Sequence, residues 1–364
     1  MGVVLLFCVF PAVVLEFPNK TKIVDYNPIR FIFESPYTSK HSLFLTPTTN
    51  SSNHRTHPIH PADMPILWEL TTKLFAQLPP VPSHFTQWEP PQSPLSTYSG
   101  VFAAIVTYLS IIFGGQRLMA DRKPMQFKPL FMLHNILLSL GSLWLLLLMI
   151  EQVAPIVYNH GTFYSICHVN AWTPQLVTLY MINYYFKYWE LLDTCFLVAK
   201  KKSLQFLHVF HHTATALLCF TQLGGRTSVS WVPITANLTV HVIMYYYYFT
   251  TSAFPGYKPW YKKALTTLQI SQFVIDLFIV YFASYSYFAA EYLGWPTMGN
   301  CTGTEGAALF GCAILTSYLF LFISFYRKTY KQNSIKKAAA AAATASSTPA
   351  VAPAGNDSNI TKKK

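Results

Sequence analysis

Charged residues are scarce in this sequence. Only 11% of its 364 residues are Asp, Glu, Lys or Arg, whereas a soluble globular domain carries roughly 25%. This scarcity argues against a soluble protein and, together with 52% hydrophobic residues, points to a membrane. The six cysteines contain no CxxC pair and no zinc-type spacing, which argues against a zinc domain.

The excess of positive charge does not predict a nucleic-acid partner. The net charge is +12, but the basic residues are absent from most apolar runs and gather in the loops between them. Such a distribution is typical of membrane topology, because basic loops stay on the cytosolic side. We therefore expect membrane lipid around the chain and no nucleic acid.

Composition divides the chain into three regions. Residues 1–92 are rich in Pro, Ser, Thr and His, and we expect them to be weakly ordered. Their apolar start, Val3–Leu15, is short for a spanning helix and lacks the basic flank of a signal peptide, so cleavage and insertion both stay open. Residues 93–330 hold the long apolar segments. Residues 331–364 form a low-complexity tail.

Seven apolar segments in the second region each approach the roughly 20 residues that a spanning helix needs. Lys and Arg fill the loops after the first, third, fifth and seventh segments, and Arg226 is the one basic residue in the other three loops. This alternation predicts an all-α, seven-helix membrane protein with an external or lumenal N-terminus and a cytosolic C-terminus. The segments lie at about 97–115, 130–150, 174–198, 204–223, 231–254, 265–290 and 305–326.

Charged side chains interrupt the third segment at "KYWELLDT", with Lys187, Glu190 and Asp193. Each would cost roughly 2.5–3.5 kcal/mol at the centre of a membrane helix, so they should face the protein interior. Lys187 and Glu190 share one face of a helix and are spaced for an ion pair. The stretch is interpreted either as an internal pair that fixes helix packing or as the wall of an active site, and we expect both roles.

Polar stripes also mark the next three segments. When depth is counted from the cytosolic end of each segment at ~1.5 Å per residue, the stripes lie together in the cytosolic half of the membrane. Beyond them the helices are apolar and aromatic, and Cys219 lies about 10 Å deeper than His212 on nearly the same face. We therefore predict a polar chamber open to the cytosol with an apolar channel behind it, which suits a ligand with a polar head and a long hydrocarbon tail. The stripes contain His208, His211 and His212, then Asn237, His241 and Tyr245, then Gln269 and Gln272.

Four motifs in these helices resemble those of the ELO family of fatty acid elongases, and the stretch "GGRTSVSWVPITANL" looks fungal. They are "KYWELLDT", "HVFHH", "NLTVHVIMYYYY" and "TTLQISQ", and they occur in this order. The resemblance covers about residues 93–330. It implies a membrane 3-ketoacyl-CoA synthase of the endoplasmic reticulum that condenses long-chain acyl-CoA with malonyl-CoA, without a bound cofactor. It also implies that the ketoreductase, dehydratase and enoyl reductase of the elongation cycle are partners; a homo-oligomer stays open.

The resemblance assigns roles to the polar residues. His211, the middle histidine of its motif, is the candidate nucleophile, since a neutral imidazole can attack a thioester and form an acyl-imidazole. His241 would contact the acyl or malonyl group, and His208 and His212 would orient His211. The candidate substrate-binding residues are Lys187, Glu190, Asp193, Asn237, Tyr245, Gln269 and Gln272.

Other protein classes share parts of this pattern. Membrane di-iron desaturases and hydroxylases also contain HxxHH, but they need several such motifs and this chain has one; we expect no metal site. A seven-helix receptor has the same topology, but the polar stripes lie toward the cytosol. A transporter is disfavoured because the two halves show no internal repeat.

Two cysteines are candidates for a disulfide. The predicted topology places the loops containing Cys167 and Cys301 on the same lumenal side, where a disulfide can persist. Two free thiols are the alternative, and the glycosylation sequon at Asn300 would hinder pairing if it carried a glycan.

Overall fold

The structure is a computed structural model that describes residues 65–77, 79, 82–254 and 256–331. The chain divides into two units, Met1–Pro58 and Ile59–Lys364. The first unit, with the apolar start, lies outside the described residues, as does nearly all of the predicted tail. The helices are α1 (Ile66–Ala76), α2 (Tyr98–Leu118), α3 (Lys128–Cys167), α4 (Pro174–Glu190), α5 (Leu192–Ala199), α6 (Phe206–Gly225), α7 (Trp231–Ala253), α8 (Lys262–Phe288) and α9 (Glu305–Tyr326), with short 3-10 turns at Ser83–Phe85, Val169–Ala171 and Ser228–Ser230 and π turns at Ala289–Leu293 and Arg327–Lys331.

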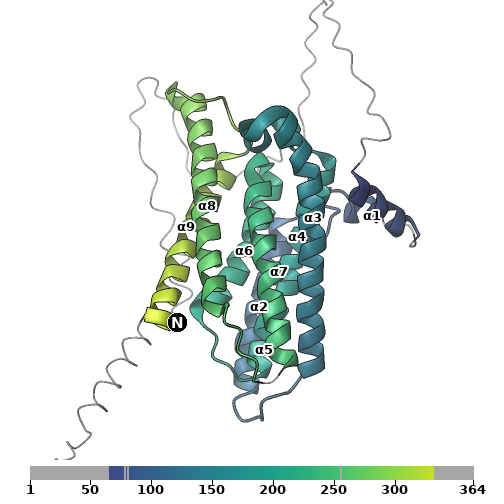
Figure 1. The fold of residues 1–364 in the computed structure, drawn as a ribbon, viewed down its shortest axis with the longest axis vertical. Coiled ribbons are helices and arrows are strands. Elements are labelled where there is room, and N and C mark those ends of the chain that lie inside the picture. The colour runs from purple at the N-terminus through teal and green to yellow at the C-terminus, as the bar shows by residue number, and fades with distance from the viewer. Residues whose placement is uncertain (1–64, 78, 80–81, 255, 332–364) are drawn as a thin grey trace, which may run out of the picture. The chain divides into compact units, whose positions relative to one another are not determined.

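The long helices run side by side (Figure 1), and six of them close into a ring. In order around the ring, α3 packs against α7, α7 against α8, α8 against α9, α9 against α6, α6 against α4, and α4 against α3. Helix α2 packs against α5 at one side. A ring of this kind leaves an interior into which several helices can each direct one face.

Threonines begin three of these helices. Thr97, Thr173 and Thr304 each accept a hydrogen bond from a backbone N–H in the first turn, of α2, α4 and α9 respectively. Such caps satisfy one of the donors that a helix start leaves free. Pro174 at the first position of α4 lacks the N–H that would otherwise need a partner.

Four described helices are long and apolar enough to cross a membrane, namely α2, α3, α8 with its π turn, and α9. All seven predicted segments are helical, so the all-helical class is observed for the described part of the chain, but the count of seven membrane crossings is not established. Helix α4, with 17 residues, is too short to qualify. Helices α6 and α7 are long enough, but they carry many of the polar motif residues, which lower their hydropathy.

The third predicted segment is divided rather than continuous. Helix α4 ends at Glu190 and α5 begins at Leu192, because the backbone N–H groups of Leu191 and Thr194 bond to carbonyls three residues earlier instead of four. Such a tightened turn inside a helix often accompanies a functional position, and this one lies inside "KYWELLDT".

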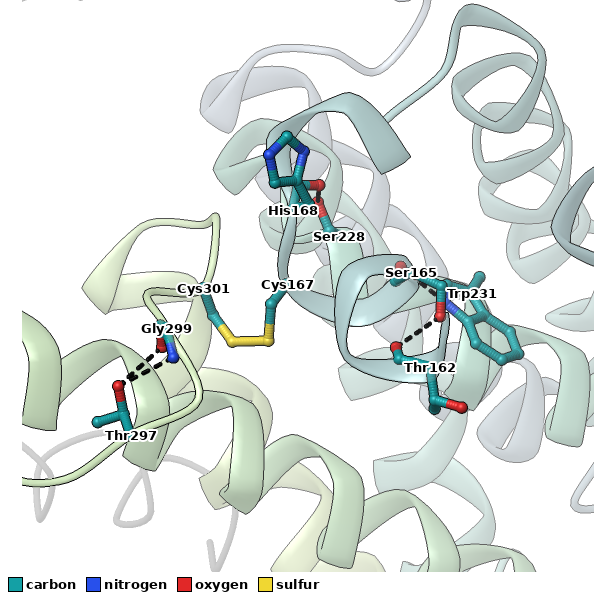
Figure 2. Close-up of a disulfide and its surroundings, with 9 residues drawn as sticks. All are labelled: Thr162, Ser165, Cys167, His168, Ser228, Trp231, Thr297, Gly299 and Cys301. Carbon is teal, nitrogen blue, oxygen red and sulfur yellow. Dashed lines mark hydrogen bonds between the residues drawn. A yellow bond between two sulfur atoms is a disulfide. The ribbon is translucent and has the colours of Figure 1, made fainter. Parts of the chain in front are cut away.

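Helix α3 extends well beyond the predicted segment and reaches Cys167. It kinks at Gly161, whose φ of 84° lies where a glycine has no steric penalty. The last turn leads into a disulfide between Cys167 and Cys301 (Figure 2). Beside it, Trp231 of α7 donates to the Ser165 carbonyl at 3.0 Å, and Ser228 donates to the His168 carbonyl at 3.0 Å. The end of α3 is thereby joined to the loop before α9 and to the start of α7.

We expect non-reducing peptide mapping of the purified protein to recover one Cys167–Cys301 cross-link, because the two cysteines are buried and paired in the structure. Reduction should lower the thermal midpoint, since the bond closes a separation of 134 residues and confines the unfolded chain. Rapid alkylation of both thiols in the native, unreduced protein would contradict the pairing.

Candidate active site

A cavity lies inside the ring of six helices. Polar side chains from four helices meet in its wall, namely Lys187 of α4, His211 of α6, Asn237 of α7 and Gln272 of α8. The cavity also has apolar walls that include Leu218, Leu223, Val229, Ile234, Val280 and Leu315. A space of this composition can hold a polar head group beside a hydrocarbon chain.

A buried ion pair within α4 contacts two polar side chains of α7. Lys187 Nζ donates to Glu190 Oε1 at 2.8 Å and to Asn237 Oδ1 at 2.8 Å. His241 Nδ1 lies 3.2 Å from the same Glu190 oxygen, and its Nε2 lies 3.2 Å from Asn237 Nδ2. The side chains of Lys187 and Glu190 are only 3% and 4% exposed. The i, i+3 pair is therefore present, and it carries a further contact to a histidine that sequence analysis treated separately.

His211 is held by helix α9. Its ring lies 4.7 Å from the Tyr318 ring, centroid to centroid. The Tyr318 hydroxyl donates to the His211 carbonyl at 3.1 Å and lies 2.8 Å from Thr215 Oγ1. Tyr318 is buried and lines the cavity. Sequence analysis did not find Tyr318, because a single tyrosine in an apolar segment forms no polar stripe.

The two other histidines of the motif, His208 and His212, are not among the residues that line this cavity. His208 Nε2 lies 3.0 Å from Thr194 Oγ1, which also accepts a hydrogen bond from Tyr108 of α2 at 2.7 Å. The His208 and His212 rings are 4.4 Å apart, and the His211 and His212 rings 5.7 Å. His208 and His212 therefore form a layer behind His211, where they can fix its position.

Asp193 also lies behind the cavity wall. Its Oδ1 is 2.8 Å from His134 Nε2, and its Oδ2 accepts from the Tyr245 hydroxyl at 2.8 Å. His134, on α3, is a further residue of this cluster that the sequence did not predict. These two hydrogen bonds favour the interpretation of Asp193 as a residue that fixes helix packing. Tyr245 belongs to the same hydrogen-bonded cluster of Asp193, His134 and Tyr245.

We expect Asp193→Leu to destabilise the protein by about 1–3 kcal/mol for each partner left without a hydrogen bond. Asp193→Asn should be mild, because its amide can accept from Tyr245 while donating to a neutral His134. The thermal midpoints of both variants, measured by size-exclusion after heating, check this. A large drop in the thermal midpoint of the asparagine variant would mean that the negative charge of Asp193 itself holds His134 and Tyr245 in place.

Further polar side chains lie in the cavity wall beside His211. Gln272 Nε2 donates to Asp276 Oδ2 at 3.1 Å, and Asp276 and Asn183 both line the cavity. Cys219 lines it as well, as expected from its spacing. The polar part of the cavity wall therefore includes Asp276 and Asn183 beside Gln272. Gln269 points elsewhere and donates to Met244 Sδ at 3.5 Å.

The arrangement is suited to nucleophilic chemistry. A buried imidazole at the wall can attack an electrophilic carbonyl, and the donors on Lys187 and Asn237 can stabilise the negative charge that develops on oxygen. Within the described residues, no three His, Cys, Asp or Glu side chains are grouped to hold a metal ion.

Comparisons with a family model and with known proteins agree on one family. Residues 93–338 match the model of the GNS1/SUR4 (ELO) family. The chain is 47% identical over 278 residues to "Putative fatty acid elongase 1" of Schizosaccharomyces pombe, which covers 76% of this chain and 82% of that protein. It is 36% identical over 261 residues to "Fatty acid elongase A" of Dictyostelium discoideum, covering 69% and 90% respectively.

A relative from a vertebrate is also similar to this chain. "Very long chain fatty acid elongase 5" of Tachysurus fulvidraco is 30% identical over 277 residues, which cover 71% of this chain and 85% of that protein. The family match includes helices α2 to α9, hence the whole ring of six helices, and every polar residue of the cavity wall. The chain is therefore a member of the ELO family.

Proposed function

We propose that this protein condenses a long-chain acyl-CoA with malonyl-CoA to give 3-ketoacyl-CoA, CO2 and CoA. Family membership makes it a multi-pass membrane enzyme of fatty acid elongation, and the condensation is the step that its cavity fits. The observation that carries the proposal is the placement of His211 in the wall of a cavity that joins polar donors to an apolar interior.

In the first half-reaction, a ring nitrogen of neutral His211 attacks the thioester carbonyl carbon. A C–N bond forms, the C–S bond breaks, and CoA leaves as a thiolate that takes a proton from solvent. The product is an acyl-imidazolium. Tyr318 and Thr215 support this step because they fix the helix turn that carries His211 and the position of its ring. A nucleophile must be held in reacting geometry.

In the second half-reaction, malonyl-CoA loses CO2 and the electron pair of the broken C–C bond gives an enolate. The enolate carbon attacks the acyl carbon, the C–N bond breaks, and neutral His211 is restored. Lys187 and Asn237 can hold the malonyl carboxylate and the thioester oxygens, because their donors meet at the cavity wall. Charge that develops on oxygen is stabilised best by donors already in place.

The proposal includes the location and partners of the enzyme. The alternation of basic loops favours a cytosolic C-terminus, so CoA substrates would enter from the cytosol. We place the protein in the endoplasmic reticulum, where the ketoreductase, dehydratase and enoyl reductase would consume its product. No bound cofactor is needed, because both substrates are activated as thioesters.

Expression in elongase-deficient microsomes tests the proposal. Microsomes containing the protein should convert radiolabelled malonyl-CoA and a ladder of saturated acyl-CoAs into 3-ketoacyl-CoA, and the ladder reports the preferred chain length. Iron bound in stoichiometric amount to the purified protein, without condensation by any acyl-CoA, would instead support the desaturase class.

A further inference from the structure

Helix α1 is fastened to the bundle at its first turn. The carboxylate of Glu151 in α3 accepts hydrogen bonds from the backbone N–H groups of Leu67 at 2.6 Å and Trp68 at 2.8 Å. A carboxylate at a helix start satisfies free donors and complements the positive end of the helix dipole. Leu67 and Trp68 also pack against the main hydrophobic core. This contact fixes both the position and the direction of α1.

The rest of the helix surface is divided into two sectors. At 100° per residue, Ile66, Leu70 and Leu74 form a stripe next to the docked face, and they are 82%, 57% and 58% exposed. On the other side of this stripe lie Glu69 and Lys73, which form an ion pair at 2.6 Å. A short helix that meets only water would gain nothing from an exposed apolar stripe of this kind.

The attachment point lies where α3 leaves the apolar region. The run from Lys128 to Ile150 would be about 34 Å long at the rise of a helix, close to the ~30 Å hydrocarbon core of a bilayer. Glu151 and Gln152 follow it directly. Figure 1 shows α1 crossing beside α3 rather than running along it. Leu67 and Trp68 therefore face protein. The apolar stripe and Phe75, which is 57% exposed, are left free on the surface, as is the ion pair.

We propose that α1 is an interfacial helix, with the Ile66–Leu70–Leu74 stripe embedded in lipid at the edge of the bilayer beside α3. Amphipathic helices bind membrane surfaces in this way through their apolar face. Helix α2, which is long and apolar enough to cross a membrane, exposes Phe102 to 70% and so marks a surface that would face lipid. The inference rests on the membrane location of the chain and does not depend on the condensation chemistry.

Site-directed fluorescence in the full-length protein tests the proposal. A cysteine at Leu70, labelled with an environment-sensitive fluorophore, is compared with the matched position Thr72, which is exposed on the same helix but lies outside the stripe. Phe102→Cys gives the reference for lipid contact, and labelled parent protein gives the background from native thiols. All are reconstituted in phosphatidylcholine vesicles.

The label at position 70 should emit at shorter wavelength than the label at 72 and be quenched by lipids that carry a shallow spin label. Quenching by aqueous iodide should be several-fold weaker at 70 than at 72. Equal iodide quenching at both positions would place the stripe in water and overturn the proposal. Protection of position 70 from both quenchers would show that protein covers the stripe, which would also overturn it.

Discussion

Replacing His211 with alanine should abolish 3-ketoacyl-CoA formation while the protein remains folded. The imidazole is the proposed attacking group, and loss of a nucleophile typically removes several orders of magnitude of rate because no other step forms the acyl intermediate. Folding should survive, because the interactions that fix this turn of α6 go to the backbone carbonyl of His211 and to Thr215. Condensation assays and size-exclusion profiles of the purified variant measure the two effects.

Cys219 provides the control, because it lines the same cavity and its thiol is another potential nucleophile. Cys219→Ala should retain condensation. Incubation with acyl-CoA alone, followed by rapid acid quench and mass mapping, should find the acyl group on His211 in both the parent and the Cys219 variant. An adduct on Cys219, lost together with activity in Cys219→Ala, would reassign the nucleophile.

The convergence of the motif residues was predictable from sequence because hydrocarbon is intolerant of charge. A lysine and two carboxylates in one apolar segment must face inward, and histidines and amides spaced along one face of neighbouring helices must then share that interior. The structure brings Lys187, His211, Asn237 and Gln272 to one cavity. The spacing of polar residues along a helix indicates which face they share, but not how far each lies from the cavity. The positions of His208 and Asp193 behind the cavity wall could therefore be found only from the structure.

Residues without a neighbouring polar pattern escaped sequence analysis. Tyr318 and His134 are isolated in apolar helices and acquire their roles only through contacts with α6 and α5. Helix α1 was missed for a related reason. Its 11 residues lie between Pro-rich stretches that predict weak order, and its stability comes from Glu151, which is 83 residues away from Trp68.

Lys187→Met should cause the largest loss of stability among single substitutions at the site, about 3–5 kcal/mol, because it leaves the buried Glu190 carboxylate without its cation. The lysine Nζ is 2.8 Å from both Glu190 and Asn237, so the amide oxygen also loses a donor. A sharp fall of the thermal midpoint, read by size-exclusion after heating, would be the expected result.

The double variant Lys187→Met with Glu190→Leu separates packing from catalysis. Removing both charges eliminates the uncompensated carboxylate, and apolar replacements of buried ion pairs are often neutral or stabilising. We therefore expect the double variant to recover most of the lost stability. Condensation should stay absent, because Lys187 is proposed to hold substrate at the cavity wall. A stable and active double variant would show that the pair only fixes α4 in the ring. A double variant as unstable as the single one would mean that Asn237 and His241, rather than Glu190, depend on the lysine.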